Sequence, residues 1–318
     1  MSKTKKRPSG HPARVTAGPR TPARKTGPRS AAGAWIAGAR LRTLPLGIAA
    51  VALGTGAAKA DVLNVSKWLV LLCLVVAVAL QIGVNYANDY SDGIRGTDDF
   101  RVGPPRLTGS GLVPARRVLV AALVFFAIAA AAGLAITIIT GQYWLIAVGV
   151  AAIAAGWFYT GGKHPYGYYA LGEVFVFVFF GLVGTAGTQF VLAGEVTTEG
   201  WLAGVAAGAI ACAVLMSNNI RDIPQDKLAK KRTLAVLIGP TASRIVYVLW
   251  IVVAYLILAF FTLLYAKALL VFFTLLVTLP AILIMLTAKK PREYIIVLQL
   301  TSLFALLYSI GLALALAY

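Results

Sequence analysis

Long apolar stretches separated by short polar connections dominate the chain from about residue 39 to its end. Each stretch approaches the ~20 residues that a helix needs to cross the hydrocarbon core of a bilayer. The pattern predicts an all-α fold, a polytopic bundle of about nine transmembrane helices. The predicted spans lie near residues 39–58, 66–88, 116–139, 143–160, 169–192, 200–219, 242–264, 267–287 and 294–317.

The overall composition excludes an ordinary soluble domain. Hydrophobic residues make up 59% of the chain and charged residues only 13%, whereas a soluble domain has about 25% charged residues. The net charge of +18 is concentrated at the N-terminus, because residues 1–33 carry nine Lys or Arg and no acid among Pro, Gly, Ser and Thr. This composition predicts a disordered basic tail at 1–33 and a transmembrane domain at 34–318.

The distribution of Lys and Arg predicts the orientation in the membrane. With the N-terminus in the cytoplasm and nine spans, 26 of the 29 basic residues lie on the cytoplasmic side. This is a strong positive-inside bias and predicts a cytoplasmic N-terminus and an external C-terminus. A basic tail beside a first membrane helix is typical of contact with anionic lipid. No aromatic residues interleave the charges, so no nucleic-acid partner is expected.

Acidic residues cluster in two short segments, NYANDYSDGIRGTDD at 85–99 and NNIRDIPQD at 218–226, each at the cytoplasmic end of a predicted span. The clustered acids, six of the eleven in the chain, are Asp89, Asp92, Asp98, Asp99, Asp222 and Asp226. Asn and Asp residues recur four positions apart in both segments, which places their side chains on one face of a helix. Because the two segments lie four spans apart, a duplicated four-helix unit would bring them together across a central cavity.

Carboxylate and amide oxygens without His or Cys partners favour Mg²⁺. The i,i+4 pairs are Asn85–Asp89, Asn88–Asp92, Asn218–Asp222 and Asp222–Asp226, and each segment therefore directs a column of such oxygens to one side. Gly96 breaks the first helix before Asp98 and Asp99, so their role stays open. Basic residues follow both segments, and metal together with Arg or Lys typically stabilises a departing diphosphate. Cytoplasmic loops also carry Lys and Arg only to fix the orientation of the protein in the membrane, and this alternative role stays open for each of these cations.

Five stretches together resemble the UbiA-type intramembrane prenyltransferases, over about residues 35–318. These are LRTLPLG from Leu41, NYANDYSDGIRGTD, RVGPPRLTGSGLVP, FYTGGKHPYGYYALGE and NNIRDIPQDKLAKKRTLAVLIG. The finer pattern is closest to the 1,4-dihydroxy-2-naphthoate polyprenyltransferases of menaquinone synthesis. The family's first motif commonly extends to a further Asp at the place that Gly96 occupies here.

The resemblance implies the reaction. Mg²⁺, with two ions expected, binds polyprenyl diphosphate, diphosphate leaves, and an aromatic carbon of 1,4-dihydroxy-2-naphthoate attacks the allylic cation with loss of CO₂, giving demethylmenaquinol. The implied metal ligands are Asn85, Asp89, Asp92, Asn218, Asp222 and Asp226. The implied catalytic residues are Asp89, Asp92, Asp222, Asp226, Lys163 and Tyr159. The implied substrate-binding residues are Arg42, Asn85, Asn88, Arg101, Arg106, Asn218, Arg221 and Glu173, with Tyr159 and Glu173 on the acceptor side.

Two alternatives stay open at the level of sequence. Another acceptor, such as 4-hydroxybenzoate or homogentisate, would use the same aspartate motifs with a different pocket. A cation-coupled transporter would place charges near the bilayer midplane or on both sides, whereas almost every charge here is cytoplasmic. The sequence thus favours a multi-pass enzyme of a bacterial plasma membrane, with its site facing the cytoplasm.

Overall fold

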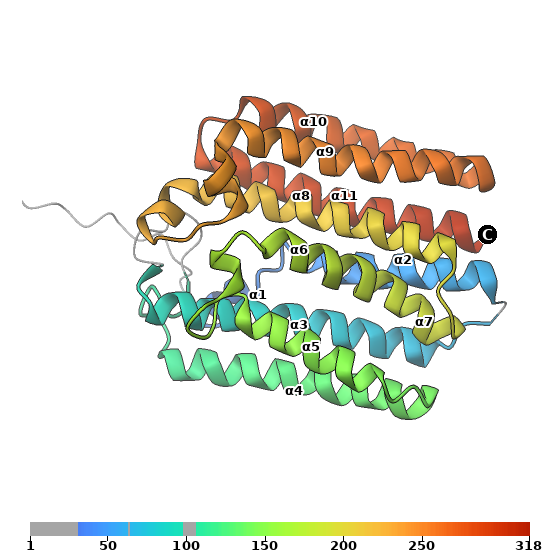
Figure 1. Cartoon of the computed structure of the whole chain (residues 1–318), viewed down its shortest axis with the longest axis horizontal. Helices are drawn as coiled ribbons and strands as arrows, with labels where there is room; N and C mark the ends of the chain where they lie inside the picture. The colour runs from blue at the N-terminus through green and yellow to red at the C-terminus, as the bar shows by residue number, and fades with distance from the viewer. Residues whose placement is uncertain (1–30, 63, 98–105) are drawn as a thin grey trace, which may run out of the picture.

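The protein is described by a computed structural model covering residues 31–62, 64–97 and 106–318. These residues form a bundle of long, roughly parallel rods (Figure 1), and no β-strand occurs among them. The helices are α1 Ala31–Ala39, α2 Pro45–Asp61, α3 Lys67–Ile94, α4 Ala115–Thr140, α5 Leu145–Phe158, η2 Tyr166–Tyr168, α6 Gly172–Val176, η3 Phe177–Ala186, α7 Gly187–Ala193, α8 Thr198–Leu228, α9 Leu234–Leu264, η4 Ala266–Thr274, α10 Leu275–Thr287 and α11 Pro291–Ala317. The predicted all-α membrane bundle is confirmed.

Seven helical stretches in the described residues are long and apolar enough to cross a membrane. They are 67–94, 115–140, 172–193, 198–228, 234–264, 266–287 and 291–317. The other two predicted spans correspond to α2, with 17 residues, and α5, with 14 residues, both shorter than the ~20 residues of a full span. The total of nine crossings therefore stays a prediction.

The first predicted span, near 39–58, is broken in the structure. Helix α1 ends at Ala39, the chain turns through Arg40–Leu44, and α2 begins at Pro45. Arg40 has a left-handed φ of 55°, which ends α1, and Pro45 is well suited to a first helical turn because its missing N–H has no partner there. Helix α1 also starts at Ala31, within the segment assigned to the tail; residues 1–30 lie outside the described part.

Helix α8 is the central rod of the bundle. In its most apolar window 78% of the residues are buried, and it packs against α9, η3, α11 and α2. Glycine permits the contact between α8 and η3. A Cβ on Gly181 of η3 would lie only 2.5 Å from the carbonyl oxygen of Gly204 in α8, so a larger residue does not fit there. Close helix packing through Gly and Ala is typical of membrane bundles. Thr197 begins α8 by accepting a hydrogen bond from the Gly200 amide.

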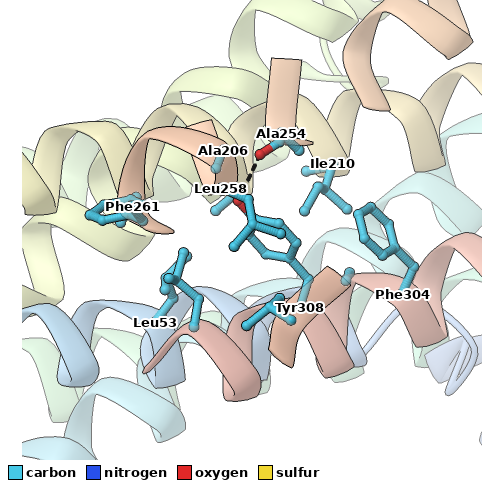
Figure 2. Close-up of a cluster of buried hydrophobic side chains, with 14 of the residues drawn as sticks. Leu53, Ala206, Ile210, Ala254, Leu258, Phe261, Phe304 and Tyr308 are labelled. Carbon is cyan, nitrogen blue, oxygen red and sulfur yellow. Dashed lines mark hydrogen bonds between the residues drawn. The ribbon is translucent and has the colours of Figure 1, made fainter. Parts of the chain in front are cut away.

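A large apolar cluster joins α8 to α2, α9 and α11 (Figure 2). Ile210, Leu258, Phe304 and Tyr308 are almost completely buried in it. The one polar group of Tyr308 donates a hydrogen bond of 2.8 Å to the Ala254 carbonyl oxygen, which removes the cost of burying a hydroxyl. The cluster fixes the position of α8, from which half of the candidate site projects.

Two irregularities modify the straight-rod picture. Residues Phe177–Ala186 form a π-helix, η3, a form often found at functional sites. Helix α9 is interrupted at Gly239, whose φ of 78° and ψ of 170° turn the chain before Pro240. Both predicted acidic segments lie at one end of the bundle, where α3 and α8 finish, and the C-terminus lies at the opposite end (Figure 1).

Candidate active site

A polar cavity of about 100 Å³ lies where the ends of α3 and α8 meet. Its walls come from both acidic segments, from the turn before α2 and from three connections. The lining residues are Arg40, Asn88, Asp92, Thr97, Arg106, Tyr159, Thr160, Leu215, Asn218, Asn219, Arg221, Asp222, Gln225, Asp226 and Lys231. The described part of the first acidic segment, 85–97, and the second segment, 218–226, thus meet around one space.

Asp92 is the buried carboxylate on the α3 side. Its side chain is 3% exposed and accepts a 2.9 Å hydrogen bond from the Tyr168 hydroxyl. The Arg106 guanidinium lies 3.8 Å from the other carboxylate oxygen. Burial and the negative charge of Asp92 raise the pKa of Tyr168 above its ordinary value. The phenol therefore stays protonated and donates a hydrogen bond to Asp92.

Asn88 lines the same wall one helical turn earlier. Its side-chain oxygen accepts a 2.6 Å hydrogen bond from the Thr160 hydroxyl. This bond attaches α3 to the connection after α5. Arg95, which follows the last residue of α3, adds to the attachment by donating to the carbonyl oxygens of Thr160 and Gly162 in that connection. The connection after α5 is therefore held against the end of α3.

On the α8 side, Arg221 and Asp222 form a two-point ion pair. The guanidinium donates to both carboxylate oxygens, at 2.7 Å and 2.6 Å, a geometry that is stronger and more directional than a single contact. Asp226 lies one turn further along and is 7% exposed. The Thr233 hydroxyl lies 3.4 Å from it.

Asn85 and Asp89 do not line this cavity, although they belong to the same i,i+4 pattern. Both carboxylate oxygens of Asp89 accept backbone hydrogen bonds, from Leu107 at 2.9 Å and from Thr108 at 2.8 Å. The Asn85 amide donates to the Ala39 carbonyl oxygen at 3.0 Å. The geometry therefore gives these two predicted metal ligands a supporting position: Asp89 fixes the turn that carries Arg106, and Asn85 fixes the end of α1.

The predicted basic residues divide into two groups. Arg106 and Arg221 line the cavity, whereas Arg42 and Lys163 are exposed side chains outside its walls. The turn at 40–44 explains the first difference, because it brings Arg40 to the wall in place of Arg42. Arg101, Asp98 and Asp99 lie outside the described residues.

The acceptor-side candidates lie together. Tyr159 lines the cavity, and its hydroxyl is 3.6 Å from where a Cβ on Gly172 would stand. The adjoining Glu173 is 5% exposed and accepts a 3.1 Å hydrogen bond from the Asn219 amide. Asn219 itself lines the cavity, so Glu173 reaches the site through it.

Sequence reasoning missed several cavity residues, among them Arg40, Asn219, Gln225 and Lys231. Asn219 and Gln225 carry a readable signal, because they lie within the second acidic segment on neighbouring helical positions. Lys231 is one of several cations that follow that segment, and no local pattern distinguishes it from Lys230. Its backbone amide donates to the Asp226 carbonyl oxygen at 2.8 Å, and its ammonium lies 5.0 Å from the centroid of the Tyr168 ring.

The donor set fits Mg²⁺ bound together with an anionic ligand. In the described ranges no group of three or more His, Cys, Asp or Glu side chains converges to hold a metal by itself. The cavity nevertheless offers Asp92, Asp222 and Asp226, and the Gln225 side-chain oxygen is buried there with no hydrogen-bond partner. Hard oxygen donors with places left for phosphate are the usual Mg²⁺ arrangement.

The fold and this cavity define a multi-pass membrane protein with a site for an anionic ligand and a divalent cation. A family model described as the UbiA prenyltransferase family matches residues 43–295. The chain belongs to the UbiA prenyltransferase family. The resemblance drawn from the sequence motifs is thereby confirmed.

Curated relatives share the family. The chain is 55% identical over 213 residues to the 1,4-dihydroxy-2-naphthoate octaprenyltransferase of Mycobacterium tuberculosis (strain ATCC 25618 / H37Rv), covering 67% of this chain and 72% of that protein. It is 35% identical over 218 residues to the enzyme of the same name from Escherichia coli (strain K12), covering 66% and 70%.

Solved structures share the fold. The apo structure of a UbiA homologue from Aeropyrum pernix K1 superposes with a TM-score of 0.65 at 16% identity, covering 83% of this chain and 96% of that one. A UbiA homologue from Archaeoglobus fulgidus bound to GPP and Mg²⁺ gives a TM-score of 0.59 at 16% identity, covering 86% and 99%. That homologue therefore binds a prenyl diphosphate with Mg²⁺ on a similar bundle.

Proposed function

We propose that the protein transfers a polyprenyl group from polyprenyl diphosphate to 1,4-dihydroxy-2-naphthoate. In the reaction the bond from the allylic carbon to the diphosphate oxygen breaks, a carbon–carbon bond to the ring forms, and the ring carboxylate leaves as CO₂. The observation that carries the proposal is the single cavity that unites both acidic segments with four basic residues. The relatives of the same family, named as naphthoate octaprenyltransferases, support the choice of acceptor.

The acidic residues hold the metal and the basic residues hold the diphosphate. Two Mg²⁺ ions are proposed, bound on the α3 side by Asn88 and Asp92 and on the α8 side by Asn218, Asp222 and Asp226. Bound with the substrate, Mg²⁺ supplies positive charge that stabilises diphosphate as a leaving group.

The four cations of the cavity act directly on the diphosphate. Arg40, Arg106, Arg221 and Lys231 place positive charge around the space where negative charge develops. Charge that is preorganised in a site poor in water stabilises a transition state more than the same charge in solution does. A site poor in water also protects an allylic cation from attack by water.

Tyr159, Asn219 and Glu173 are proposed to bind the acceptor. Tyr159 and Asn219 present polar groups to the cavity, and Glu173 lies behind Asn219 at the start of α6. The Glu173 carboxylate accepts the hydrogen bond of the Asn219 amide and thereby fixes the orientation of Asn219 toward the acceptor. The enzyme is further proposed to lie in a bacterial plasma membrane with this cavity on the cytoplasmic side, as the distribution of basic residues favours.

An assay with purified protein tests the function. Geranylgeranyl diphosphate and Mg²⁺ are offered with either 1,4-dihydroxy-2-naphthoate or 4-hydroxybenzoate, and EDTA is the control. A prenylated, decarboxylated naphthoquinol formed only with metal supports the proposal. Product from 4-hydroxybenzoate alone would contradict the acceptor assignment, and product from neither would contradict the proposed reaction.

A further inference from the structure

Tyr168 does not line the cavity, but it contacts the first acidic segment and the stretch of chain that follows the second one. It ends the short helix η2 in the connection between α5 and α6. Its hydroxyl donates to Asp92 at 2.9 Å and lies 3.0 Å from the Thr97 hydroxyl. The hydroxyl therefore contacts the end of α3 twice, once at a proposed metal ligand.

Two cations lie over the ring of Tyr168. The guanidinium carbon of Arg95 is 5.7 Å from the ring centroid, and the Lys231 ammonium is 5.0 Å from it. Both distances are within the range of a cation–π attraction. Arg95 comes from the first acidic segment and Lys231 from the chain beyond the second. One aromatic ring thus holds a cation from each half of the site.

The backbone of Tyr168 adds a third link. Its carbonyl oxygen accepts a 3.0 Å hydrogen bond from the Arg232 amide, and the next residue, Tyr169, forms an isolated parallel β-bridge with Arg232. Lys231 is therefore attached to Tyr168 by its side chain and through its backbone neighbour. This attachment keeps the Lys231 ammonium at the cavity wall.

The neighbouring tyrosines separate this arrangement from ordinary packing at a membrane interface. Tyr169 is 55% exposed, and its hydroxyl lies 3.5 Å from Nδ1 of the exposed His164. Tyr166 stacks on Phe175 with ring centroids 3.9 Å apart and donates to the Ala155 carbonyl oxygen. Only Tyr168 of the three directs its hydroxyl to a carboxylate of the cavity.

We propose that Tyr168 is a positioning residue for the metal–diphosphate site, whose hydroxyl orients Asp92 and whose ring holds Lys231 at the diphosphate. The inference rests on the proposed function, since it assigns the cavity to diphosphate and Mg²⁺. It adds to the residues that line the cavity one residue that acts from behind its wall.

Two variants separate the two actions of Tyr168. Tyr168→Phe removes only the hydroxyl. It is expected to raise the Mg²⁺ concentration for half-maximal activity about tenfold, the scale of one hydrogen bond to a charged group, with the KM for the naphthoate unchanged. Tyr168→Leu also removes the ring. It is expected to raise, in addition, the KM for the prenyl diphosphate about tenfold above that of Tyr168→Phe. Tyr169→Phe is the matched control and should behave as the wild type.

A binding measurement gives a second readout that does not depend on turnover. The thermal unfolding midpoint of each detergent-purified protein is recorded alone, with Mg²⁺, and with Mg²⁺ plus inorganic pyrophosphate. The ligand-free midpoint of Tyr168→Phe should equal that of the wild type, while its stabilisation by Mg²⁺ and pyrophosphate should be smaller. Equal stabilisation and equal Mg²⁺ dependence in Tyr168→Phe and the wild type would overturn the inference.

The same experiment distinguishes failure of the inference from failure of the proposed function. If the wild type makes no prenylated product, the proposed reaction is wrong, and the pyrophosphate measurement then decides on Tyr168 alone. If the wild type is active and Tyr168→Phe matches it in both readouts, only the role of Tyr168 is wrong.

Discussion

Asp89 and Asp92 stand three positions apart in one helix but serve different partners. Successive residues of an α-helix are offset by about 100°, so a spacing of three directs the two side chains about 60° apart. Asp92 reaches the cavity, whereas Asp89 accepts hydrogen bonds from the backbone of the turn at 107–108. At the scale of the residue, therefore, one carboxylate lies at the cavity and the other supports the turn beside it.

The first prediction separates these two carboxylates. Asp92→Asn should lower kcat by about a hundredfold or more, because it removes a charge at the proposed metal, and should abolish stabilisation by Mg²⁺ and pyrophosphate. Asp89→Asn should keep that stabilisation, although the unfolding free energy should fall by about 1–3 kcal/mol as a backbone N–H loses its acceptor. Steady-state kinetics measure kcat, and thermal unfolding with and without ligand measures the stability and the stabilisation by Mg²⁺ and pyrophosphate. Loss of pyrophosphate binding in Asp89→Asn at an unchanged midpoint would show that Asp89 is itself a ligand.

A second prediction concerns Arg221. Arg221→Lys keeps the positive charge but cannot donate to both oxygens of Asp222 in one plane. We expect the KM for the prenyl diphosphate to rise about tenfold while the midpoint of unfolding stays near that of the wild type. Steady-state kinetics at saturating Mg²⁺ provide the test. An unchanged KM would mean that the ion pair does not shape the diphosphate site.

At the scale of the element, close contact between helices depends on missing side chains. A Cβ on Gly56 would lie 2.3 Å from the Ala313 Cα, which means that α2 and α11 touch at backbone distance. Similarly, a Cβ on Gly54 would lie 2.2 Å from the Thr185 carbonyl oxygen in η3. The two glycines of α2 therefore allow α11 and η3 to approach its backbone closely. Helix α2 begins directly after the turn that carries Arg40.

The third prediction tests this packing. Gly56→Ala should destabilise the bundle by about 1–3 kcal/mol, because two backbones must separate to admit the methyl group. Gly133→Ala in α4 is the matched control, since no heavy atom lies within 4 Å of its added Cβ, and it should be neutral or slightly stabilising. The unfolding midpoint in detergent is the readout. Equal midpoints for the two variants would contradict the close α2–α11 contact.

The sequence predicts most helices and both acidic segments because length, hydropathy and i,i+4 spacing are local properties. It does not predict the turn at 40–44, the interruption at Gly239 or the inward direction of Lys231, because contacts between distant segments determine these. Arg40 and Arg42 illustrate the limit: two residues of the same type, two positions apart, are assigned correctly only when the turn between α1 and α2 is known. The relation of Tyr168 to Asp92 joins residues 76 positions apart.

At the scale of the whole molecule, the ends of α3 and α8 lie at the opposite end of the bundle from the C-terminus (Figure 1), and these two helix ends contribute residues to the cavity. Of the 29 basic residues, only Lys59, Lys67 and Lys267 fall on the end assigned to the exterior. This asymmetry gives the bundle one polar, positively charged end, which in the proposed function faces the cytoplasm and receives the aromatic acid and the diphosphate.

The fourth prediction concerns this orientation. A fluorescent protein fused after Tyr318 should be dark and an alkaline phosphatase fused there should be active, because the C-terminus is predicted to be external. The same reporters fused in the connection at Lys289–Lys290, before α11, should give the opposite result. Cell fluorescence and phosphatase activity measure both. A bright C-terminal fusion would require an even number of crossings and would contradict the predicted nine.

The central claim is that one cavity couples departure of diphosphate to prenylation and decarboxylation of a naphthoate. The most direct measurement uses 1,4-dihydroxy-2-naphthoate with a ¹³C label in its carboxylate and follows diphosphate, labelled CO₂ and prenylated product together. The account predicts equal amounts of all three with Mg²⁺, and none with EDTA or in Asp92→Asn. Release of diphosphate without prenylated product, or a prenylated product that retains the label, would contradict it.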